Sequence, residues 1–146
     1  MKDKYILLVE DNPDDELLTL RALRKNRVAN DIVVVRDGVE ALNYLFGEGD
    51  YADRNTSEMP AVILLDLKLP KIDGLEVLRR IREDKKTMLL PVVILTSSKE
   101  EQDLINGYMN GANSYLRKPI GFEEFAEVVR QLHLYWLVIN EPPPNV

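Results

Sequence analysis

The segment Ala61-Val62-Ile63-Leu64-Leu65-Asp66 is a continuous apolar run that ends directly in a carboxylate. A short run that is apolar at every position, and not at alternate positions, is typical of a strand covered on both faces. Two further runs, residues 5–9 and 92–95, share this pattern, and residues 31–35 are a fourth candidate. A short, mixed run over residues 114–117 is typical of an edge strand. We therefore expect five strands in a largely buried sheet.

Helical patterns alternate with these apolar runs. Asn12 can cap a helix that opens with Pro13, and the acidic residues after Pro13 suit the positive end of the helix dipole. Apolar residues at steps of three and four then mark further helices, which we expect over residues 39–46, 75–81 and 122–136. Between the last two, Ser98 and Glu101 form a capping box for another helix, which Gly111 would end. Strands that alternate with helices in this way predict a parallel sheet with helices on both faces, joined by right-handed crossovers.

The composition is that of a single folded domain, and it excludes several classes of protein. The chain has 146 residues, of which 45% are hydrophobic and 30% are charged. Because it has no cysteine and one histidine, it offers neither a disulfide scaffold nor a multi-histidine metal site. The net charge of −6 argues against non-specific nucleic-acid binding. No apolar run is long enough for a membrane span or a signal peptide, so we expect a cytoplasmic protein.

Chemically useful side chains stand at the ends of four predicted strands. Glu10 and Asp11 follow the first strand, Asp66 follows the third, Thr96 ends the fourth and Lys118 follows the fifth. Because open α/β sheets bind ligands at the carboxyl ends of their strands, we expect these groups to meet at one edge. A single acid after a strand is commonly a helix cap, but capping does not explain all of these residues together.

Three converging carboxylates, on Glu10, Asp11 and Asp66, require positive charge between them. Two unit charges about 4 Å apart repel by about 4 kcal/mol at an effective dielectric constant of about 20. The ammonium group of Lys118 and a divalent cation would both offset this repulsion. Mg²⁺ fits best, because it prefers oxygen ligands, takes one or two carboxylates and bridges to phosphate oxygens.

A carboxylate beside Mg²⁺, a hydroxyl group and a lysine is suited to accept a phosphoryl group. Aspartate forms a covalent aspartyl phosphate in such sites. The cations neutralise the transferring group while Thr96 hydrogen-bonds one of its oxygens. The chain has no glycine-rich loop that would cradle a nucleotide. The sequence therefore predicts a phosphoryl acceptor at Asp66 and not a kinase.

Several segments, in this order, resemble the receiver domain of two-component response regulators. They are Ile6-Leu7-Leu8-Val9-Glu10-Asp11-Asn12, Ile63-Leu64-Leu65-Asp66-Leu67, Leu69-Pro70 with Asp73-Gly74, Leu95-Thr96-Ser97 and Lys118-Pro119. The resemblance covers residues 4 to about 137. It implies a flavodoxin-like, doubly wound sheet of five parallel strands in the order 2-1-3-4-5, with helices on both faces.

The resemblance also implies how the acids at this edge are used. Asp66 would be phosphorylated by a histidine kinase. Glu10 and Asp11 would bind Mg²⁺ together with Asp66, and the backbone carbonyl of Lys68 would be a further ligand.

Three more positions match the switch residues of this family. Thr96 corresponds to the switch hydroxyl, Tyr115 to the switch aromatic and Lys118 to the phosphate-binding lysine. After phosphorylation, Thr96 would move toward the phosphoryl group and Tyr115 would turn inward. The surface of the fourth helix, fifth strand and fifth helix would change as a result.

The receiver domain is expected to span residues 1–140, with an extended, proline-rich tail over residues 141–146. Residues 132–139 are apolar almost all round a helix, which indicates a surface that another chain covers. We expect no output domain. Output would then pass through protein contacts or through onward transfer of the phosphoryl group.

A narrower resemblance is carried by Tyr135-Trp136-Leu137, by Asn140-Glu141-Pro142 and by the long polar loop over residues 48–60. These segments resemble the small, stand-alone response regulators that are paired with bacterial phytochrome kinases, including those of cyanobacteria. This resemblance implies a homodimer formed through the C-terminal region. It also implies a phytochrome-type histidine kinase as the phosphodonor.

Two alternative functions remain open. A Mg²⁺-dependent aspartate-nucleophile phosphohydrolase would use the same residue types, but it needs a carboxylate two residues after the nucleophile, where this chain has Lys68. A pseudo-receiver would bind partners without being phosphorylated, but here every acceptor-site residue is present. We therefore expect a phosphoacceptor switch and not an enzyme, apart from self-catalysed phosphotransfer and dephosphorylation.

Overall fold

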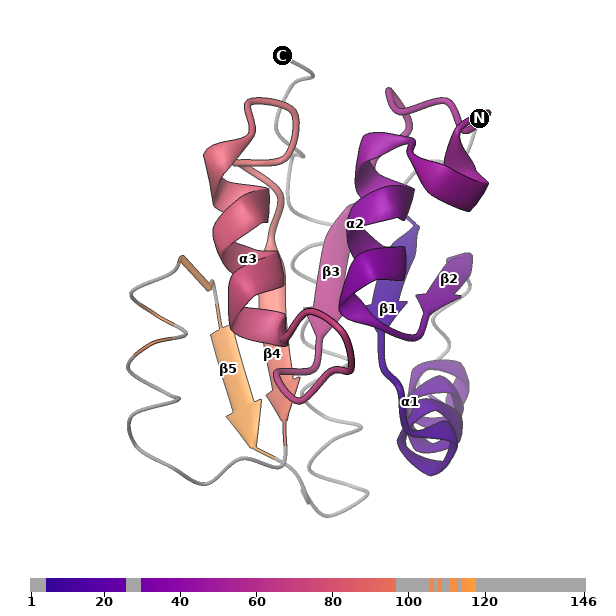
Figure 1. Ribbon diagram of the computed structural model, residues 1–146. Coiled ribbons are helices and arrows are strands. Elements are labelled where there is room, and N and C mark those ends of the chain that lie inside the picture. Colours follow the sequence, from indigo (N-terminus) through magenta and orange to yellow (C-terminus); the bar gives the residue numbers. More distant parts are fainter. Residues whose placement is uncertain are drawn as a thin grey trace.

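The computed structural model of the chain contains a five-stranded sheet with helices packed on its two faces (Figure 1). It describes residues 5–25, 30–96, 106, 108, 111, 112 and 114–117, and of residues 96 and 114–117 it describes the backbone alone. The strand order is β2-β1-β3-β4-β5, and every neighbouring pair is parallel. The predicted doubly wound sheet with strand order 2-1-3-4-5 is confirmed.

The strands coincide with the apolar runs of the sequence. They are β1 Ile6–Val9, β2 Ile32–Val35, β3 Val62–Leu65, β4 Val92–Thr96 and β5 Ser114–Arg117. All residues of β1 and β3 are buried, as expected of strands covered on both faces. Val9 of β1 lies in register with Val35 on one side and with Leu65 on the other. The carboxyl ends of β1 and β3 therefore lie side by side at one edge of the sheet.

Three of the predicted helices lie within the described residues: α1 Pro13–Lys25, α2 Gly38–Phe46 and α3 Gly74–Glu83. Asp37 and Asp73 cap α2 and α3, because their side chains accept hydrogen bonds from backbone N–H groups three residues on. Of the predicted fourth helix, residues 106 and 108 are described, and both are helical. The predicted fifth helix and the proline-rich tail lie outside the described residues. No helix in the described ranges is long and apolar enough to cross a membrane.

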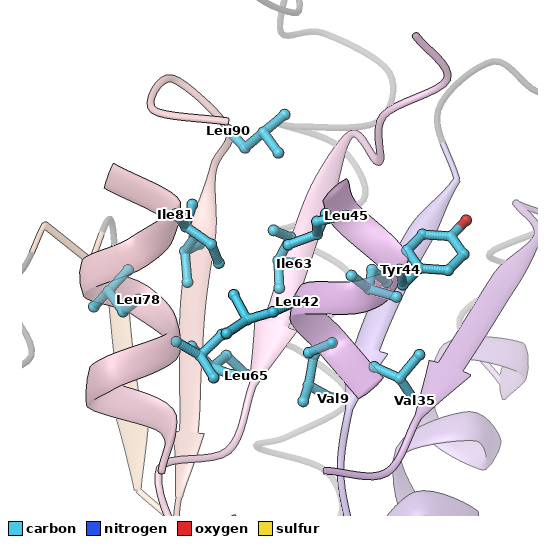
Figure 2. Packing of buried hydrophobic residues seen from close by; sticks show 14 of the residues in the cluster. Val9, Val35, Leu42, Tyr44, Leu45, Ile63, Leu65, Leu78, Ile81 and Leu90 are labelled. Carbon is cyan, nitrogen blue, oxygen red and sulfur yellow. The ribbon is translucent and has the colours of Figure 1, made fainter. Parts of the chain in front are cut away.

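Alternate strand residues supply two cores, one on each face of the sheet. Leu7 and Val9 of β1 belong to the core beneath α2 and α3, whereas Ile6 and Leu8 pack with α1. Figure 1 shows α2 and α3 in front of the sheet and α1 behind it. Figure 2 shows how the larger core is filled by side chains of both helices and the strands beneath them: Leu42, Leu45, Leu78, Ile81, Val9, Ile63 and Leu65. This two-sided burial explains why the strands are apolar at every position.

The polar loop over residues 48–60 is more ordered than its sequence predicts. It contains a 3₁₀ turn, η1 Gly49–Tyr51. The guanidinium group of Arg54 lies over the ring of Tyr44 in α2, 4.1 Å from the ring centre. Arg54 also donates hydrogen bonds to the carbonyl oxygens of Tyr44 (2.5 Å) and Glu58 (2.8 Å). The side chain of Arg54 thus connects two parts of the loop with each other and with the C-terminal half of α2.

Candidate functional site

Three carboxylates from separate elements meet at the carboxyl edge of the sheet. Glu10 follows β1, Asp66 follows β3 and Asp15 stands in the first turn of α1. One carboxylate oxygen of each residue lies within 4.8 Å of an oxygen of the other two. The side chains of Glu10 and Asp66 are nearly inaccessible, with 2% and 7% of their surface exposed. The site is therefore a compact acidic cluster at the rim of the core.

Backbone hydrogen bonds of the sheet set the positions of Glu10 and Asp66. The N–H group of Glu10 donates to the carbonyl oxygen of Val35 in β2 (3.0 Å), and that of Asp66 donates to Val9 in β1 (3.1 Å). Each acid thus extends its strand by one further hydrogen bond. Because parallel neighbours end at the same edge, two acids that each follow a strand become spatial neighbours.

The beginning of α1 is attached directly to Glu10. The N–H group of Asn12 donates to Oε2 of Glu10 (3.3 Å). The side-chain oxygen of Asn12 in turn accepts hydrogen bonds from the backbone N–H groups of Asp14 (2.8 Å) and Asp15 (3.1 Å). Asn12 therefore caps the helix as predicted. The same contacts hold the first helical turn next to the acids of the sheet edge.

The loop between β3 and α3 supports Asp66 from the other side. The backbone N–H group of Lys68 donates to Oδ1 of Asp66 (3.0 Å), while the side chain of Lys68 is exposed. The N–H group of Gly74 donates to the carbonyl oxygen of Leu67 (2.8 Å). A Cβ atom at Gly74 would lie 2.3 Å from the carbonyl oxygen of Asp66, so only glycine permits α3 to begin this close to the acid.

The structure brings together some of the predicted site residues and leaves others apart. Glu10 and Asp66 are neighbours as predicted. Asp11 is exposed and is not one of the three clustered acids, because the chain leaves the sheet after Glu10 to begin α1. Asp15 is the third acid of the cluster. From the sequence, only a favourable interaction with the helix dipole was expected of it. Asp15 stands four residues before the buried Thr19, on the side of α1 that packs on the sheet, and this side is known from the packed structure and not from the sequence.

Two of the remaining predicted residues, Thr96 and Tyr115, lie in β4 and β5. Thr96 is the last residue of β4, and its backbone lies in register with Arg117 of β5. The backbone of Tyr115 lies in β5, opposite Ile94. The side chains of Thr96 and Tyr115, and all of Lys118, lie outside the described residues. The strand positions agree with the predicted edge, and the roles of these three residues stay predictions.

The donors of this cluster fit a divalent cation that prefers oxygen. Carboxylates this close repel one another strongly where water is excluded. A hard cation such as Mg²⁺ or Mn²⁺ relieves that repulsion and accepts carboxylate and carbonyl oxygens as ligands. Among the described residues, this is the group of acids close enough to share one ion.

Comparison with known proteins agrees with the fold and identifies a family. The model of the response regulator receiver domain matches residues 6–130. The probable methanogenesis regulatory protein FilR2 of Methanothrix harundinacea is 42% identical over 139 residues, which cover 94% of this chain and 86% of FilR2. Response regulator Rcp1 of Synechocystis is 37% identical over 134 residues, which cover 92% of this chain and 89% of Rcp1.

Solved structures of two related proteins superpose on nearly the whole chain. The phosphorylated cyanobacterial phytochrome response regulator RcpA is 39% identical with a TM-score of 0.86, and the match covers 97% of this chain and 99% of RcpA. The Mn²⁺-bound form of Rcp1 is 35% identical with a TM-score of 0.84, and the match covers 97% and 99% of the two chains. Relatives of this chain are thus known in a phosphorylated form and in a metal-bound form.

Proposed function

The chain belongs to the response regulator receiver domain family, and on that basis we propose that Asp66 accepts a phosphoryl group from a histidine kinase. The phosphorylated form would then change its contacts with other proteins. The observation that carries this proposal is the position of Asp66. It is 93% buried at the end of β3 and shares a cluster with two other carboxylates. A buried acid next to two other carboxylates is suited to bind a cation and to accept a phosphoryl group.

The transfer makes one bond and breaks another. A carboxylate oxygen of Asp66 forms a bond to phosphorus while the bond between phosphorus and the histidine nitrogen of the kinase breaks. The N–H group of Lys68, 3.0 Å from Oδ1 of Asp66, orients the carboxylate for this attack. We propose that Mg²⁺ is held by Glu10 and Asp66, with Asp11 and the backbone carbonyl of Lys68 as further ligands. When bound, Mg²⁺ offsets the charge of the acids and of the phosphoryl oxygens.

The switch residues complete this proposal. We assign Thr96 as the hydroxyl that hydrogen-bonds the phosphoryl group, Lys118 as the ammonium that pairs with it and Tyr115 as the aromatic residue that follows Thr96. The backbone positions of Thr96 and Tyr115 in adjacent strands support the assignment. Contacts made only with the phosphorylated aspartate would shift the population toward the active state.

The phosphodonor that we propose is a phytochrome-type histidine kinase. The likeness to RcpA, a phytochrome response regulator, supports this choice. FilR2, which is 42% identical to this chain, is a probable methanogenesis regulatory protein and not a phytochrome response regulator. The class of histidine kinase that phosphorylates this chain must therefore be tested directly. We also propose a cytoplasmic homodimer that forms through residues 132–139 and has no nucleic-acid or membrane partner. The receiver domain would span residues 1–140.

Phosphorylation of the purified chain tests the central proposal. Incubation with Mg²⁺ and an acyl phosphate donor should add one phosphoryl group, measured by intact-protein mass spectrometry. Asp66→Asn should abolish the addition. Asp73→Asn is the matched control, because Asp73 lies in the same loop and asparagine caps α3 equally well. Undiminished phosphorylation of Asp66→Asn would refute the assignment.

The same preparation separates the switch from a phosphohydrolase. A hydrolase of this kind needs an acid two residues after Asp66, and the side chain there is the exposed Lys68. We therefore expect no sustained turnover of a phosphate monoester. Release of phosphate over many cycles that depends on Asp66 would favour the hydrolase, and the absence of any phosphorylation would favour a pseudo-receiver.

A further inference from the structure

Lys71, in the loop between β3 and α3, has a backbone conformation that lysine rarely adopts. Its φ angle is 70°, and it is the one residue other than glycine with a positive φ in the part of the chain that the structure describes. The N–H group of Ile72 donates to the carbonyl oxygen of Pro70 (2.9 Å), so Lys71 is the central residue of a three-residue γ-turn. A positive φ belongs to the rarer, strained form of this turn. Such strain persists only where neighbouring contacts hold the turn in place.

Contacts with the beginning of α2 hold the turn at Lys71. The N–H group of Gly38, at the beginning of α2 beside the loop (Figure 1), donates to the carbonyl oxygen of Pro70 (3.3 Å). A Cβ atom at Gly38 would lie 2.0 Å from the carbonyl oxygen of Ile72, so α2 begins in direct contact with the loop. Nζ of Lys71 also pairs with Oδ2 of Asp37 (3.4 Å), but the side chain of Lys71 is 64% exposed, and water screens such a pair. The backbone contacts therefore hold the turn more than the ion pair does.

A second tight turn in the same loop supports Asp66. The N–H group of Leu69 donates to the carbonyl oxygen of Leu67 (3.2 Å), so Lys68 is the central residue of this turn. The N–H group of Lys68 donates to Oδ1 of Asp66 (3.0 Å). The direction of the Asp66 carboxylate thus depends on the conformation of the turn at Lys68, which lies three residues before Lys71.

The loop is too short for the two turns to change independently. Its base is closed where the N–H group of Gly74 donates to the carbonyl oxygen of Leu67 (2.8 Å), with residues 68–73 between them. On the C-terminal side of Lys71, the chain is confined by the contact with α2 and by the cap that Asp73 forms for α3. A different φ at Lys71 would therefore displace the chain on its N-terminal side, where the turn that supports the acceptor carboxylate lies.

We propose that Lys71 is a positioning residue for the phosphorylation of Asp66. Its left-handed turn, held against α2, keeps the N–H group of Lys68 in the place from which it binds Oδ1 of Asp66. The inference rests on the proposed function, in which Asp66 attacks phosphorus. One oxygen of the carboxylate is thereby fixed, and rotation of the carboxylate is limited before the phosphodonor arrives. Because Lys71 acts through its backbone, a residue that accepts a positive φ should be able to replace it.

Substitutions that differ in their tolerance of a positive φ test this inference. Glycine and asparagine accept the left-handed region, whereas a β-branched residue does not. With Mg²⁺ and an acyl phosphate donor, Lys71→Gly and Lys71→Asn should therefore be phosphorylated at a rate within about twofold of that of the unmodified chain. Lys71→Val should be phosphorylated about tenfold to a hundredfold more slowly, the loss expected of a misplaced reacting group.

Lys86→Val is the matched control for the lost charge and the added valine. Lys86 is also exposed and lies in a turn, but it does not have a positive φ. The rate of phosphorylation of Lys86→Val should therefore equal that of the unmodified chain. Circular dichroism establishes that each variant is folded at the temperature of the assay.

Hydrogen exchange of the Lys68 amide, followed by NMR in the unphosphorylated chain, is a second readout that does not depend on phosphoryl transfer. Exchange should be faster in Lys71→Val than in the unmodified chain and unchanged in Lys71→Gly. Lys71→Ala, which strains the turn less than valine does, should fall between the two in both readouts. It decides the question if Lys71→Val does not fold.

The outcomes distinguish this inference from the proposed function beneath it. If Lys71→Val keeps the rate of the unmodified chain, or if Lys71→Gly loses as much activity as Lys71→Val, the turn does not position Asp66 and the proposed function stands. If the unmodified chain is not phosphorylated while exchange of the Lys68 amide responds to Lys71→Val as expected, the proposed function fails and the effect of Lys71 on this amide stands.

Discussion

Tyr51, which lies outside the acidic cluster, affects the stability of the fold at high pH. The hydroxyl group of Tyr51 in η1 donates to Oε2 of Glu40 in α2 (2.6 Å). Burial, together with the hydrogen bond to the Glu40 carboxylate, raises the pKa of Tyr51 to about 12. The other oxygen of Glu40 accepts the backbone N–H group of Arg36 (2.8 Å). The loop, α2 and the end of β2 are thereby connected through one carboxylate.

The raised pKa of Tyr51 predicts a loss of stability in alkali. A phenol whose pKa is higher in the folded state stabilises the fold below its unfolded pKa of 10.0, and this contribution disappears as the pH rises through about 12. Tyr51→Phe should weaken the alkaline pH dependence, to which Tyr5 also contributes because burial raises its pKa. The substitution should cost about 1 kcal/mol at neutral pH, the usual net value of one hydrogen bond. Urea denaturation at a series of pH values measures both effects.

Tyr108→Phe is the control for this series, because the side chain of Tyr108 is 51% exposed. It should leave the stability between pH 10 and about 12 dependent on pH as in the unmodified chain. The interpretation of Tyr51 is wrong if Tyr51→Phe and Tyr108→Phe show the same alkaline profile.

At the scale of the elements, one arginine joins α3 to two loops. Nε of Arg82 donates to the carbonyl oxygen of Gly111 (2.8 Å), and Nη1 donates to those of Leu90 (2.7 Å) and Met88 (3.0 Å). Leu90 lies two residues before β4, and Gly111 lies three residues before β5. Burial lowers the pKa of Arg82. The side chain therefore fixes where both strands enter the sheet, with a fork of donors that lysine does not have.

Arg82→Lys should destabilise the fold by about 1–3 kcal/mol, because the partly buried carbonyl oxygens of Gly111 and Leu90 lose their donors. The matched control is Arg80→Lys on the exposed side of α3. Arg80 pairs with Glu76 (2.9 Å), an ion pair at the surface whose loss costs about 0–1 kcal/mol. Chemical denaturation measures the free energy of unfolding of both variants. Equal stabilities would show that Arg82 does not fix the beginnings of β4 and β5.

At the scale of the whole molecule, the proposed dimer is based on the apolar residues 132–139 of the sequence. The helix expected there would be apolar all round and would need more cover than one small sheet provides. Sedimentation equilibrium should therefore give the mass of a dimer for the full chain, and the mass of a monomer once residues 134–146 are removed.

The control for this truncation ends the chain after residue 140, which removes the proline-rich tail alone and should leave the dimer intact. Far-UV circular dichroism establishes that each shortened chain is folded. A full chain that sediments as a monomer, or a chain ending at residue 133 that remains a dimer, would contradict the proposed interface.

Much of the fold could be predicted from the sequence, because a strand that is buried on both faces is apolar at every position. Every position of β1 and β3 is apolar, so the runs over residues 5–9 and 61–65 identified these strands without any structure. The capping residue Asn12 likewise predicted where α1 begins, whereas the caps Asp37 and Asp73 were not predicted. Alternation of the elements then determined the parallel sheet. Asp66 was identified as a rim residue because an acid directly follows a buried strand.

The three-dimensional arrangement alone decided which acids share the site and what holds the loops. Asp11 and Asp15 are both acids near the end of β1, and no local pattern ranks one above the other as a partner of Asp66. The rotation of α1 on the sheet places Asp15 inward, and that rotation depends on packing between residues distant in sequence. The sequence also does not distinguish Arg54 and Arg82 from ordinary surface charges. Their acceptors are backbone carbonyl oxygens, which every residue carries, so no residue type marks the contact. The positions of the strands follow from local burial, whereas the convergence of side chains depends on how the finished elements pack.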